Sequence, residues 1–363
     1  MQLLELWLKP FRNFTSLHLC FESSHTLVFG PNGRGKSNVL EAISYLSIGK
    51  SARGAKDAQA VPHTGVFFDI RGLYRVGSHT QKMRLFFGKK EGKKAVLDDN
   101  ALPRVADMLG HFRTVHFSPE DVSLVLRFPA RRRRMLDILL SQSSASYLRD
   151  LQTYQRVLQQ RNSLLRETKK KTSTQLSEAE LGPWDSQLAD FGARIRTARF
   201  EALDILRGPF AALYDRFSPT GENSDIRYKG VISECKAEDF EQALLEELRR
   251  KRSQEMHVGH TLCGPHRDDV SFDLNGQSAD LYASEGQLKT ILISWKLAEC
   301  TYLAQRCDQQ PVVLLDDVFS ELDQARIGVL LEVVREFNQV VITTPQELNA
   351  RTTSQFEQIR LEA

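Results

Sequence analysis

The residues best suited to chemistry form a glycine-rich loop behind a short apolar run. Leu27-Val28-Phe29 is followed by Gly30-Pro31-Asn32-Gly33-Arg34-Gly35-Lys36-Ser37. The glycines let the backbone curl so that several N–H groups point at one phosphate chain, and a helix beginning near Lys36 adds its positive dipole end. Lys36 is expected to reach the β and γ phosphates, and Ser37 to ligate Mg²⁺. This P-loop therefore predicts a nucleotide-binding site.

A second apolar run ends in two carboxylates. Val312-Val313-Leu314-Leu315 leads into Asp316 and Asp317. An acid at the end of a parallel strand can ligate Mg²⁺, so Asp316 is expected to hold the metal together with Ser37. Asp317 is then placed to orient and deprotonate the attacking water, which makes Asp317, Asp316 and Lys36 the candidate catalytic residues. Such a pair alone could be turn or helix-capping acids, but the P-loop in the same chain favours the chemical interpretation.

Two shorter motifs flank this acidic pair. Ser284-Glu285-Gly286-Gln287 precedes a helix and resembles the signature motif of ABC-type ATPases. A serine hydroxyl, glycine amides and a positive helix end suit a terminal phosphate. Ser320-Glu321-Leu322-Asp323 lies where such proteins carry the D-loop. Ordinary helix caps are the alternative for both, with Ser284 capping one helix and Ser320 or Asp323 capping the next.

The elements that must position these residues can be read from hydrophobic periodicity. Val39, Ile43 and Leu46 predict a helix behind the P-loop, and alternation predicts strands at 4–8, 17–21, 67–74, 83–87 and 270–274. Asn275-Gly276 marks a tight hairpin turn. Ser118-Pro119-Glu120-Asp121 opens a helix, and long helices follow to about Phe217, interrupted by Lys169-Lys170-Lys171 and resuming near Trp184.

The fold class that follows is α/β, and the resemblance to ABC-type ATPases implies an ABC-ATPase head of the P-loop NTPase type with a mixed sheet and an inserted helical second lobe. We predict the N-terminal half of the head at 1–117, the helical lobe at 118–256, and the C-terminal half at 257–363, which carries the signature, the acidic pair and the D-loop.

Composition sets broad limits. The 363 residues carry 49 basic and 46 acidic side chains, so a DNA-binding surface must come from local arrangement and not from overall charge. No run is long enough for a membrane span, and the N-terminal segment does not read as a signal peptide. The five cysteines are dispersed without a CxxC pair, which fits a reducing cytoplasm, predicts no zinc site and indicates buried structural roles.

The order of these motifs resembles the SMC-like branch of ABC ATPases and, more closely, the RecF family of bacterial recombination and gap-repair proteins. The resemblance spans nearly the whole chain. It rests on the motifs above and on three further blocks: Phe11-Arg12-Asn13-Phe14, the helix from Ser118-Pro119-Glu120-Asp121 to Leu136-Asp137, and Gly264-Pro265-His266-Arg267-Asp268.

The resemblance implies a function in DNA repair, DNA replication and the SOS response. Two heads would sandwich two ATP molecules, with Arg12, Asn13 and Asn38 joining the P-loop at the nucleotide and each signature acting on the nucleotide of the partner subunit. The ATP-driven homodimer would bind gapped or single-strand/double-strand junction DNA and help to load recombinase together with recombination mediator proteins. Slow ATP hydrolysis would release it.

The chain departs from the family pattern at three places. Arg127-Phe128-Pro129 replaces a loop that usually carries a glycine and a small residue before proline. Glu285 stands where glutamine is usual, so an acid would face the phosphates unless it points away. Thr343-Thr344 stands where transporters and SMC heads have a switch histidine, which leaves a hydroxyl as the phosphate sensor.

Other interpretations stay open. A transporter ATPase subunit also carries a P-loop, but the wide split between the P-loop and the acidic pair disfavours it. An SMC-type structural tether would need a much longer helical insertion. A small-molecule kinase would need an acceptor pocket, for which the sequence offers no residues. Arg131-Arg132-Arg133-Arg134 could contact DNA or pair with acids of its own lobe. His266 and Arg267 could touch nucleotide or DNA, or form a structural turn.

Overall fold

The computed structural model describes residues 1–363 except 123–127, 171–177, 219–220, 231–238, 346–354 and 362–363. The chain divides into two compact units. We call Met1–Leu124, Pro209–Glu222 and Ala283–Ala363 the sheet unit, and Val125–Gly208 with Asn223–Tyr282 the helical unit. Arg127 of the unusual loop and Lys171 of the lysine run lie outside the described residues.

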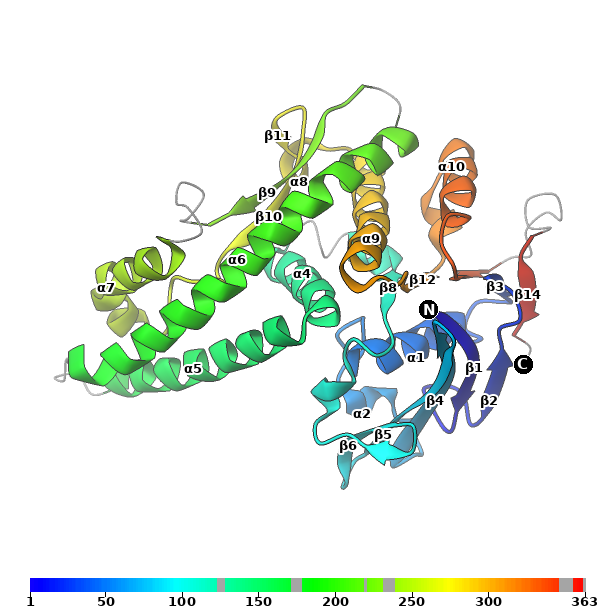
Figure 1. Ribbon diagram of the computed structural model, residues 1–363, viewed down its shortest axis with the longest axis horizontal. Coiled ribbons are helices and arrows are strands. Elements are labelled where there is room, and N and C mark those ends of the chain that lie inside the picture. Colours follow the sequence, from blue (N-terminus) through cyan, green and yellow to red (C-terminus); the bar gives the residue numbers. More distant parts are fainter. Residues whose placement is uncertain (123–127, 171–177, 219–220, 231–238, 346–354, 362–363) are drawn as a thin grey trace. The chain divides into compact units, whose positions relative to one another are not determined.

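A five-stranded parallel sheet in the sheet unit carries the chemical motifs (Figure 1). Its order is β14 (Glu357–Arg360), β3 (His25–Phe29), β13 (Val340–Thr344), β12 (Val312–Leu315) and β8 (Thr114–Phe117). The P-loop follows β3 and the acidic pair follows β12, with the end of β13 between them. Because the strands are parallel, these three ends meet at one edge, where α/β sheets bind ligands.

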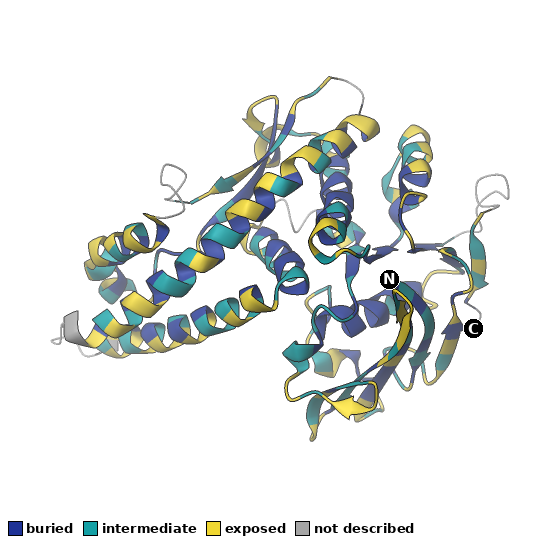
Figure 2. Ribbon diagram, viewed as in Figure 1, coloured by how far each residue is buried: buried dark blue, intermediate teal, exposed yellow. Residues whose placement is uncertain are grey.

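A six-stranded antiparallel sheet forms the other layer of the sheet unit. Its order is β2 (Leu17–Cys20), β1 (Gln2–Leu8), β4 (Phe67–Val76), β5 (His79–Gly88), β6 (Gly92–Leu97) and β7 (Asn100–Ala101). The P-loop helix α1 (Lys36–Ile48) contacts strands of both sheets. From Val39 to Ile48 every residue of α1 is buried, as the dark blue helix in Figure 2 shows. The shared core therefore fixes the helix that begins at Lys36.

The remaining helices of the sheet unit follow the C-terminal motifs. The long helix α9 (Glu285–Cys307) follows the signature serine, and α10 (Gln324–Val334) follows the D-loop. Short elements of this unit include α2 (Asp57–Ala60), the 3₁₀ turns Val105–Met108 and Val318–Glu321, and the helical residues 119–122, where the sequence predicts a helix to open. None of the described helices is long and apolar enough to cross a membrane.

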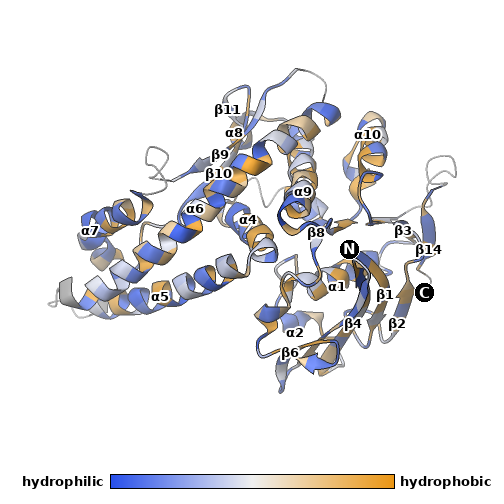
Figure 3. Cartoon of the chain, viewed as in Figure 1, coloured by the Kyte–Doolittle hydropathy of each residue, from blue (hydrophilic) through white to orange (hydrophobic). Residues whose placement is uncertain are grey.

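The helical unit consists of long helices with a small sheet. Its helices are α4 (Pro129–Ser143), α5 (Ala145–Lys170), α6 (Glu178–Phe217, which continues into the sheet unit from Pro209), α7 (Phe240–Val258) and α8 (Ala279–Tyr282). Its sheet contains β9 (Ser224–Lys229), β10 (Asp269–Leu274) and β11 (Gln277–Ser278). Helices α5 and α7 are mostly hydrophilic (Figure 3).

Most predicted elements are confirmed, and one start is wrong. Asn275 and Gly276 have φ angles of 51° and 78°, as the predicted tight turn requires. Helix α6 begins at Glu178 and not near Trp184. Leu181 is fully buried, so packing holds the first turn, and Pro183 near the helix start removes only one backbone donor. The division into three segments at 117/118 and 256/257 stays a prediction.

Candidate nucleotide site

The P-loop begins at Gly30 and ends where α1 starts. Gly35 is the N-cap of α1 with φ 93°. A Cβ at this position would lie 2.6 Å from the Asn13 side-chain oxygen and 2.6 Å from the Phe14 ring, so only glycine fits. Asn13 Nδ2 donates to the Arg34 carbonyl at 3.2 Å, and Asn38 Nδ2 donates to Asn13 Oδ1 at 2.8 Å. The two asparagines are thus held against the loop.

Arg12 is fixed by an acid that sequence reasoning missed. Its guanidinium donates to both carboxylate oxygens of Glu41, at 2.9 and 2.7 Å, and to the Gln59 carbonyl at 2.9 Å. Glu41 is fully buried in α1 and also accepts from Ser51 Oγ at 2.5 Å. The sequence could have indicated this pair, because Glu41 lies inside the mostly apolar segment 39–48 and a buried carboxylate needs a cationic partner. Arg12, Asn13 and Asn38 line a surface pocket of about 550 Å³ beside the P-loop.

Lys36 lies at the buried end of the loop. Its ammonium donates to the carbonyls of Gly30 at 2.7 Å and Pro31 at 3.0 Å. Desolvation by burial lowers the pKa of Lys36, while the charges of Asp317 and Asp316 oppose that shift. The cation and both acids of the predicted catalytic set therefore belong to one electrostatic cluster.

Asp316 joins three segments of the chain. Its Oδ1 accepts from Ser37 Oγ at 2.8 Å and from Thr343 Oγ1 at 2.7 Å, and its Oδ2 accepts from Arg53 at 2.7 Å. Only 3% of Asp316 is exposed. The structure thus brings Ser37 and Asp316 together as predicted for a metal pair, and it adds Arg53, for which no local sequence pattern gave a signal.

Asp317 has the environment of a base. It adopts a left-handed backbone conformation with φ 45°, and its N–H donates to Thr343 Oγ1 at 3.0 Å. Its Oδ1 is buried and has no hydrogen-bond partner among the described residues. Desolvation raises the pKa of Asp317, and the neighbouring charge of Asp316 raises it further, although a hydrogen bond from Ser320 opposes the shift. Thr343, proposed from sequence as a phosphate sensor, uses its hydroxyl to hold both acids.

The signature residues cap α9. Ser284 Oγ accepts from the Gln287 N–H at 3.3 Å, and the Gln287 side chain accepts from the Ser284 N–H at 2.7 Å. This capping box was one of the two interpretations, and it leaves Ser284 exposed. The Glu285 side chain is 82% exposed and lies 3.3 Å from Lys289. The unusual acid is therefore paired with a cation on its own helix.

The D-loop residues follow the same pattern. Asp323 caps α10 by accepting from the Arg326 N–H at 2.9 Å, and Ser320 Oγ donates to the Asp317 carbonyl at 2.8 Å. Lys289 of α9 also pairs with Glu321 at 2.9 Å. One lysine therefore links the signature helix to the D-loop, with Leu322 between Glu321 and the capping acid.

The comparisons with known proteins agree with this fold. The chain matches the family model described as "RecF/RecN/SMC N terminal domain" over residues 2–362. Two solved heads of Smc proteins share the fold at 13% and 12% identity, with TM-scores of 0.55 and 0.56. The parallel sheet, the P-loop and the acidic strand thus define an ABC-ATPase head of the SMC class.

More similar relatives place the chain in one family of this class of ATPase heads. The "DNA replication and repair protein RecF" of Heliobacterium modesticaldum is 38% identical over 98% of this chain and 95% of its own length. That of Moorella thermoacetica is 38% identical over 95% of this chain and 90% of its own length. A structure described as "Structure of the recombination mediator protein RecF-ATP in RecFOR pathway" has a TM-score of 0.88 and 34% identity, covering 96% of this chain and 93% of that one. The chain belongs to the RecF family.

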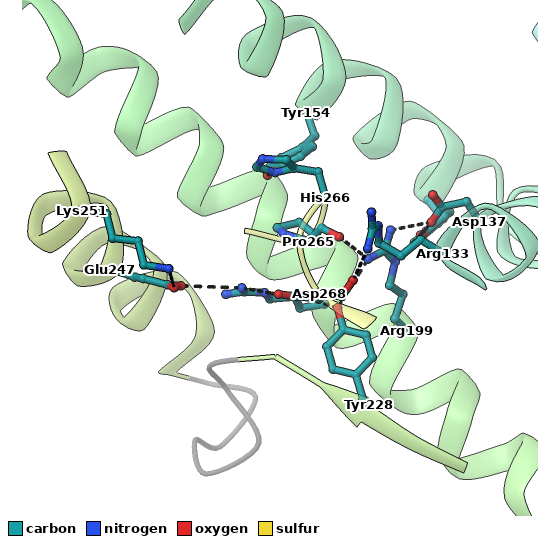
Figure 4. Close-up of polar contacts among 12 residues, drawn as sticks. Arg133, Asp137, Tyr154, Arg199, Tyr228, Glu247, Lys251, Pro265, His266 and Asp268 are labelled. Carbon is teal, nitrogen blue, oxygen red and sulfur yellow. Dashed lines mark hydrogen bonds and ion pairs between the residues drawn. The ribbon is translucent and has the colours of Figure 1, made fainter. Parts of the chain in front are cut away.

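The Gly264–Asp268 block is a structural turn of the helical unit (Figure 4). Arg199 donates to the Pro265 carbonyl at 2.7 Å, and the Asp268 carboxylate accepts from Arg196 at 2.7 Å and from Tyr228 at 2.7 Å. His266 contacts the Tyr154 hydroxyl at 2.6 Å and the Thr261 carbonyl at 3.3 Å. Both ring nitrogens of His266 therefore have protein partners, which favours the structural alternative.

The arginine run serves the same turn. Arg132 pairs with Asp269 at 2.6 Å, and Arg133 donates to the Asp268 carbonyl at 2.7 Å. Only 5% of Arg132 is exposed. These two arginines pair within their own unit, which is the alternative to DNA contact that the sequence left open.

One group with metal-binding chemistry lies outside the nucleotide site. Glu5, His18 and Cys20 place their donor atoms within 4.8 Å of one another. Spacing along the chain could not reveal it, because the group depends on the pairing of Glu5 opposite Cys20 across β1 and β2. Exposed groups of this kind are common without an ion, so we assign no metal to it.

Proposed function

We propose that this chain is an ATP-dependent DNA-binding protein of recombinational repair and replication restart. ATP binding would assemble two copies, the dimer would bind gapped or junction DNA in the cytoplasm, and slow hydrolysis would act as a timer. The observation that carries the proposal is the 2.8 Å contact between Ser37 of the P-loop and Asp316 of the acidic strand. The RecF relatives described with ATP and as recombination mediators support it.

The residues present fit Mg-ATP. The serine hydroxyl and the carboxylate of Asp316 are hard oxygen ligands of the kind Mg²⁺ prefers, so Ser37 and Asp316 would hold the metal. Bound Mg²⁺ would neutralise phosphate charge. Lys36 would exchange its two carbonyl partners for phosphate oxygens, and the loop N–H groups between Asn32 and Ser37 would surround the phosphate chain.

Hydrolysis would use Asp317 as the base. Its unpartnered buried oxygen and raised pKa suit a group that accepts a proton from water. The signature residues Ser284, Glu285, Gly286 and Gln287 would complete the site from the partner subunit, and the D-loop from Ser320 to Asp323 would cross the dimer interface. Ser284, Glu285 and Asp323 are exposed in the single chain and so are available to a second copy.

The proposal predicts that Lys36→Ala abolishes ATP binding, because the β and γ phosphates lose their cation. The measurement is equilibrium binding of a fluorescent ATP analogue, with Lys90→Ala, an exposed lysine of the β5–β6 turn, as the matched control. A second arm measures binding of gapped DNA with ATP, with ADP and without nucleotide. Normal ATP affinity of Lys36→Ala would contradict the assignment of Lys36 to the ATP site. Equal DNA affinity under all three conditions would show that DNA binding does not depend on ATP.

A further inference from the structure

The solvent face of the six-stranded sheet carries an unusual set of side chains. Along β4, Phe68, Ile70 and Tyr74 are fully buried, while Phe67, Arg71 and Arg75 are exposed. This alternation is typical of an antiparallel sheet that covers a core on one side and meets water on the other. Exposed and buried residues alternate along the strands of this sheet in Figure 2.

The strand register gathers cations on this face. Arg71 lies opposite Arg84, Leu73 opposite Lys82, and Phe86 opposite Lys94. The basic residues of the face on β4, β5 and β6 are Arg71, Arg75, Lys82, Arg84 and Lys94. Like charges on neighbouring strands disfavour the sheet, so such a cluster needs another reason to exist.

One buried acid orders the middle of the cluster. Asp69 accepts from Arg71 at 2.8 Å and from Arg84 at 2.7 Å. Burial alone would raise the pKa of Asp69, but the hydrogen bonds and charges of the two arginines lower it below its usual value. Two guanidinium groups share the Asp69 carboxylate, and the register also places Glu5 on this face opposite Leu73, so the cations of the face still outnumber its acids. The Asp69 carboxylate also fixes both arginines in place.

Aromatic rings lie among these cations. Phe67 and Phe86 stack with centroids 5.6 Å apart, and the Arg84 guanidinium lies 5.9 Å from the Phe86 centroid. Phe67 is 38% exposed. Across the arginine pair, Trp7 lies opposite Arg71 and stacks on His18 at 4.9 Å with an interplanar angle of 4°. Two ring pairs thus flank a row of arginines on one face.

We propose that this face, which we call the basic–aromatic face, binds a single-stranded stretch of DNA. The cations would contact phosphates, and unpaired bases would stack on the Phe67–Phe86 pair and on Trp7. A duplex hides the faces of its bases, so the rings favour a single strand, while the charges alone would suit either form. The inference rests on the proposed function for DNA as the partner, and it names the surface and the strand type.

The first test reverses charge. Arg75→Glu/Lys82→Glu/Lys94→Glu changes three exposed cations of the face and leaves the Asp69 pair intact. The control Arg306→Glu/Arg335→Glu/Arg360→Glu makes the same net change at exposed positions elsewhere in the sheet unit. Anisotropy with a labelled oligothymidine in ATP should show binding weakened at least tenfold in the first variant only. Loss of three phosphate contacts should also lower the slope of log K against log salt by about 2.

The second test removes the rings and keeps their apolar character. Phe67→Leu/Phe86→Leu should weaken oligothymidine binding roughly tenfold and leave duplex binding of the same length nearly unchanged. A thermal melt of each variant verifies that the sheet still folds. An equal loss on both DNA forms, or a charge variant that binds like its control, would overturn the inference. Failure of the unaltered chain to bind any DNA would instead contradict the proposed function.

Discussion

At the scale of single residues, Asp316 is the centre of the candidate nucleotide site. Its carboxylate is the shared acceptor of Ser37, Thr343 and Arg53, which come from three separate segments. Asp317 beside it keeps one buried oxygen without a partner among the described residues. Two adjacent acids therefore have different environments, one saturated by donors and one poised to accept a proton.

Asp317→Asn should retain ATP binding and lose hydrolysis by about 10²- to 10⁴-fold, because an amide cannot take the proton of water. Phosphate release measured beside ATP affinity separates the two effects. In the unaltered chain the raised pKa of Asp317 should make hydrolysis fall with decreasing pH earlier than an ordinary aspartate would. Turnover of the variant at the normal rate would assign the base to another group.

His266 predicts a pH-dependent stability. Burial lowers the pKa of His266 to about 4. Between that value and about 6.5, the ordinary pKa, the unfolded chain binds a proton that the folded chain does not, so stability falls as pH falls through this window. The contribution is on the order of 3 kcal/mol for the full shift.

Replacing the ring tests this directly. His266→Gln should flatten the loss of stability between pH 6.5 and 4, because glutamine does not titrate. Denaturant unfolding of both chains across this range gives the difference, which cancels the titration of the carboxylates they share. Parallel curves for the two chains would show that His266 does not carry this pH dependence.

At the scale of elements, the segment after α1 adds a competitor for the metal. Arg53 pairs with Asp316 Oδ2 at 2.7 Å, and Mg²⁺ would need the same carboxylate. Arg53→Ala should therefore lower the Mg²⁺ concentration that half-saturates ATP binding about fivefold, since a partly exposed ion pair is worth about 1 kcal/mol. Arg53→Lys is the control that keeps the charge. An unchanged or higher Mg²⁺ requirement would show that the arginine does not compete.

Substitutions of Ser284, at the start of α9, can distinguish a helix-capping role from a role in the signature motif. Ser284→Arg should leave the ATP affinity of the single chain nearly intact. It should abolish ATP-driven dimerisation and hydrolysis, because the bulky side chain would occupy the space of the γ-phosphate that the partner subunit holds. Loss of a cap alone would cost about 1 kcal/mol and spare assembly, as Ser284→Ala should demonstrate. Melting temperature and size in ATP are measured together. A Ser284→Arg chain that still dimerises would leave only the capping role.

The motifs and elements were predictable where the signal is local. The P-loop, the acidic strand and the Asn275-Gly276 turn depend on neighbours along the chain, and all three lie where predicted. The Glu41–Arg12 and Arg53–Asp316 pairs depend on packing between segments that are distant in sequence. The start of α6 was missed because Gly182-Pro183 signals a break locally, whereas burial of Leu181 holds the helix.

At the scale of the whole molecule, the proposed dimer would complete a site that a single chain holds only in part. The P-loop and the acidic pair assemble within one chain, whereas Ser284 of the signature and Asp323 of the D-loop are exposed N-caps of α9 and α10. A ligand that joins two chains stabilises the assembly until it is cleaved. ATP would therefore set both the size of the particle and its affinity for DNA.

The most direct test is the mass of the Asp317→Asn chain by light scattering in ATP and in ADP. A single chain has a mass of 41.3 kDa. We expect a particle of twice that mass in ATP, which persists because hydrolysis is blocked, and a single chain in ADP. The same mass in both nucleotides would contradict ATP-driven dimerisation, the central claim.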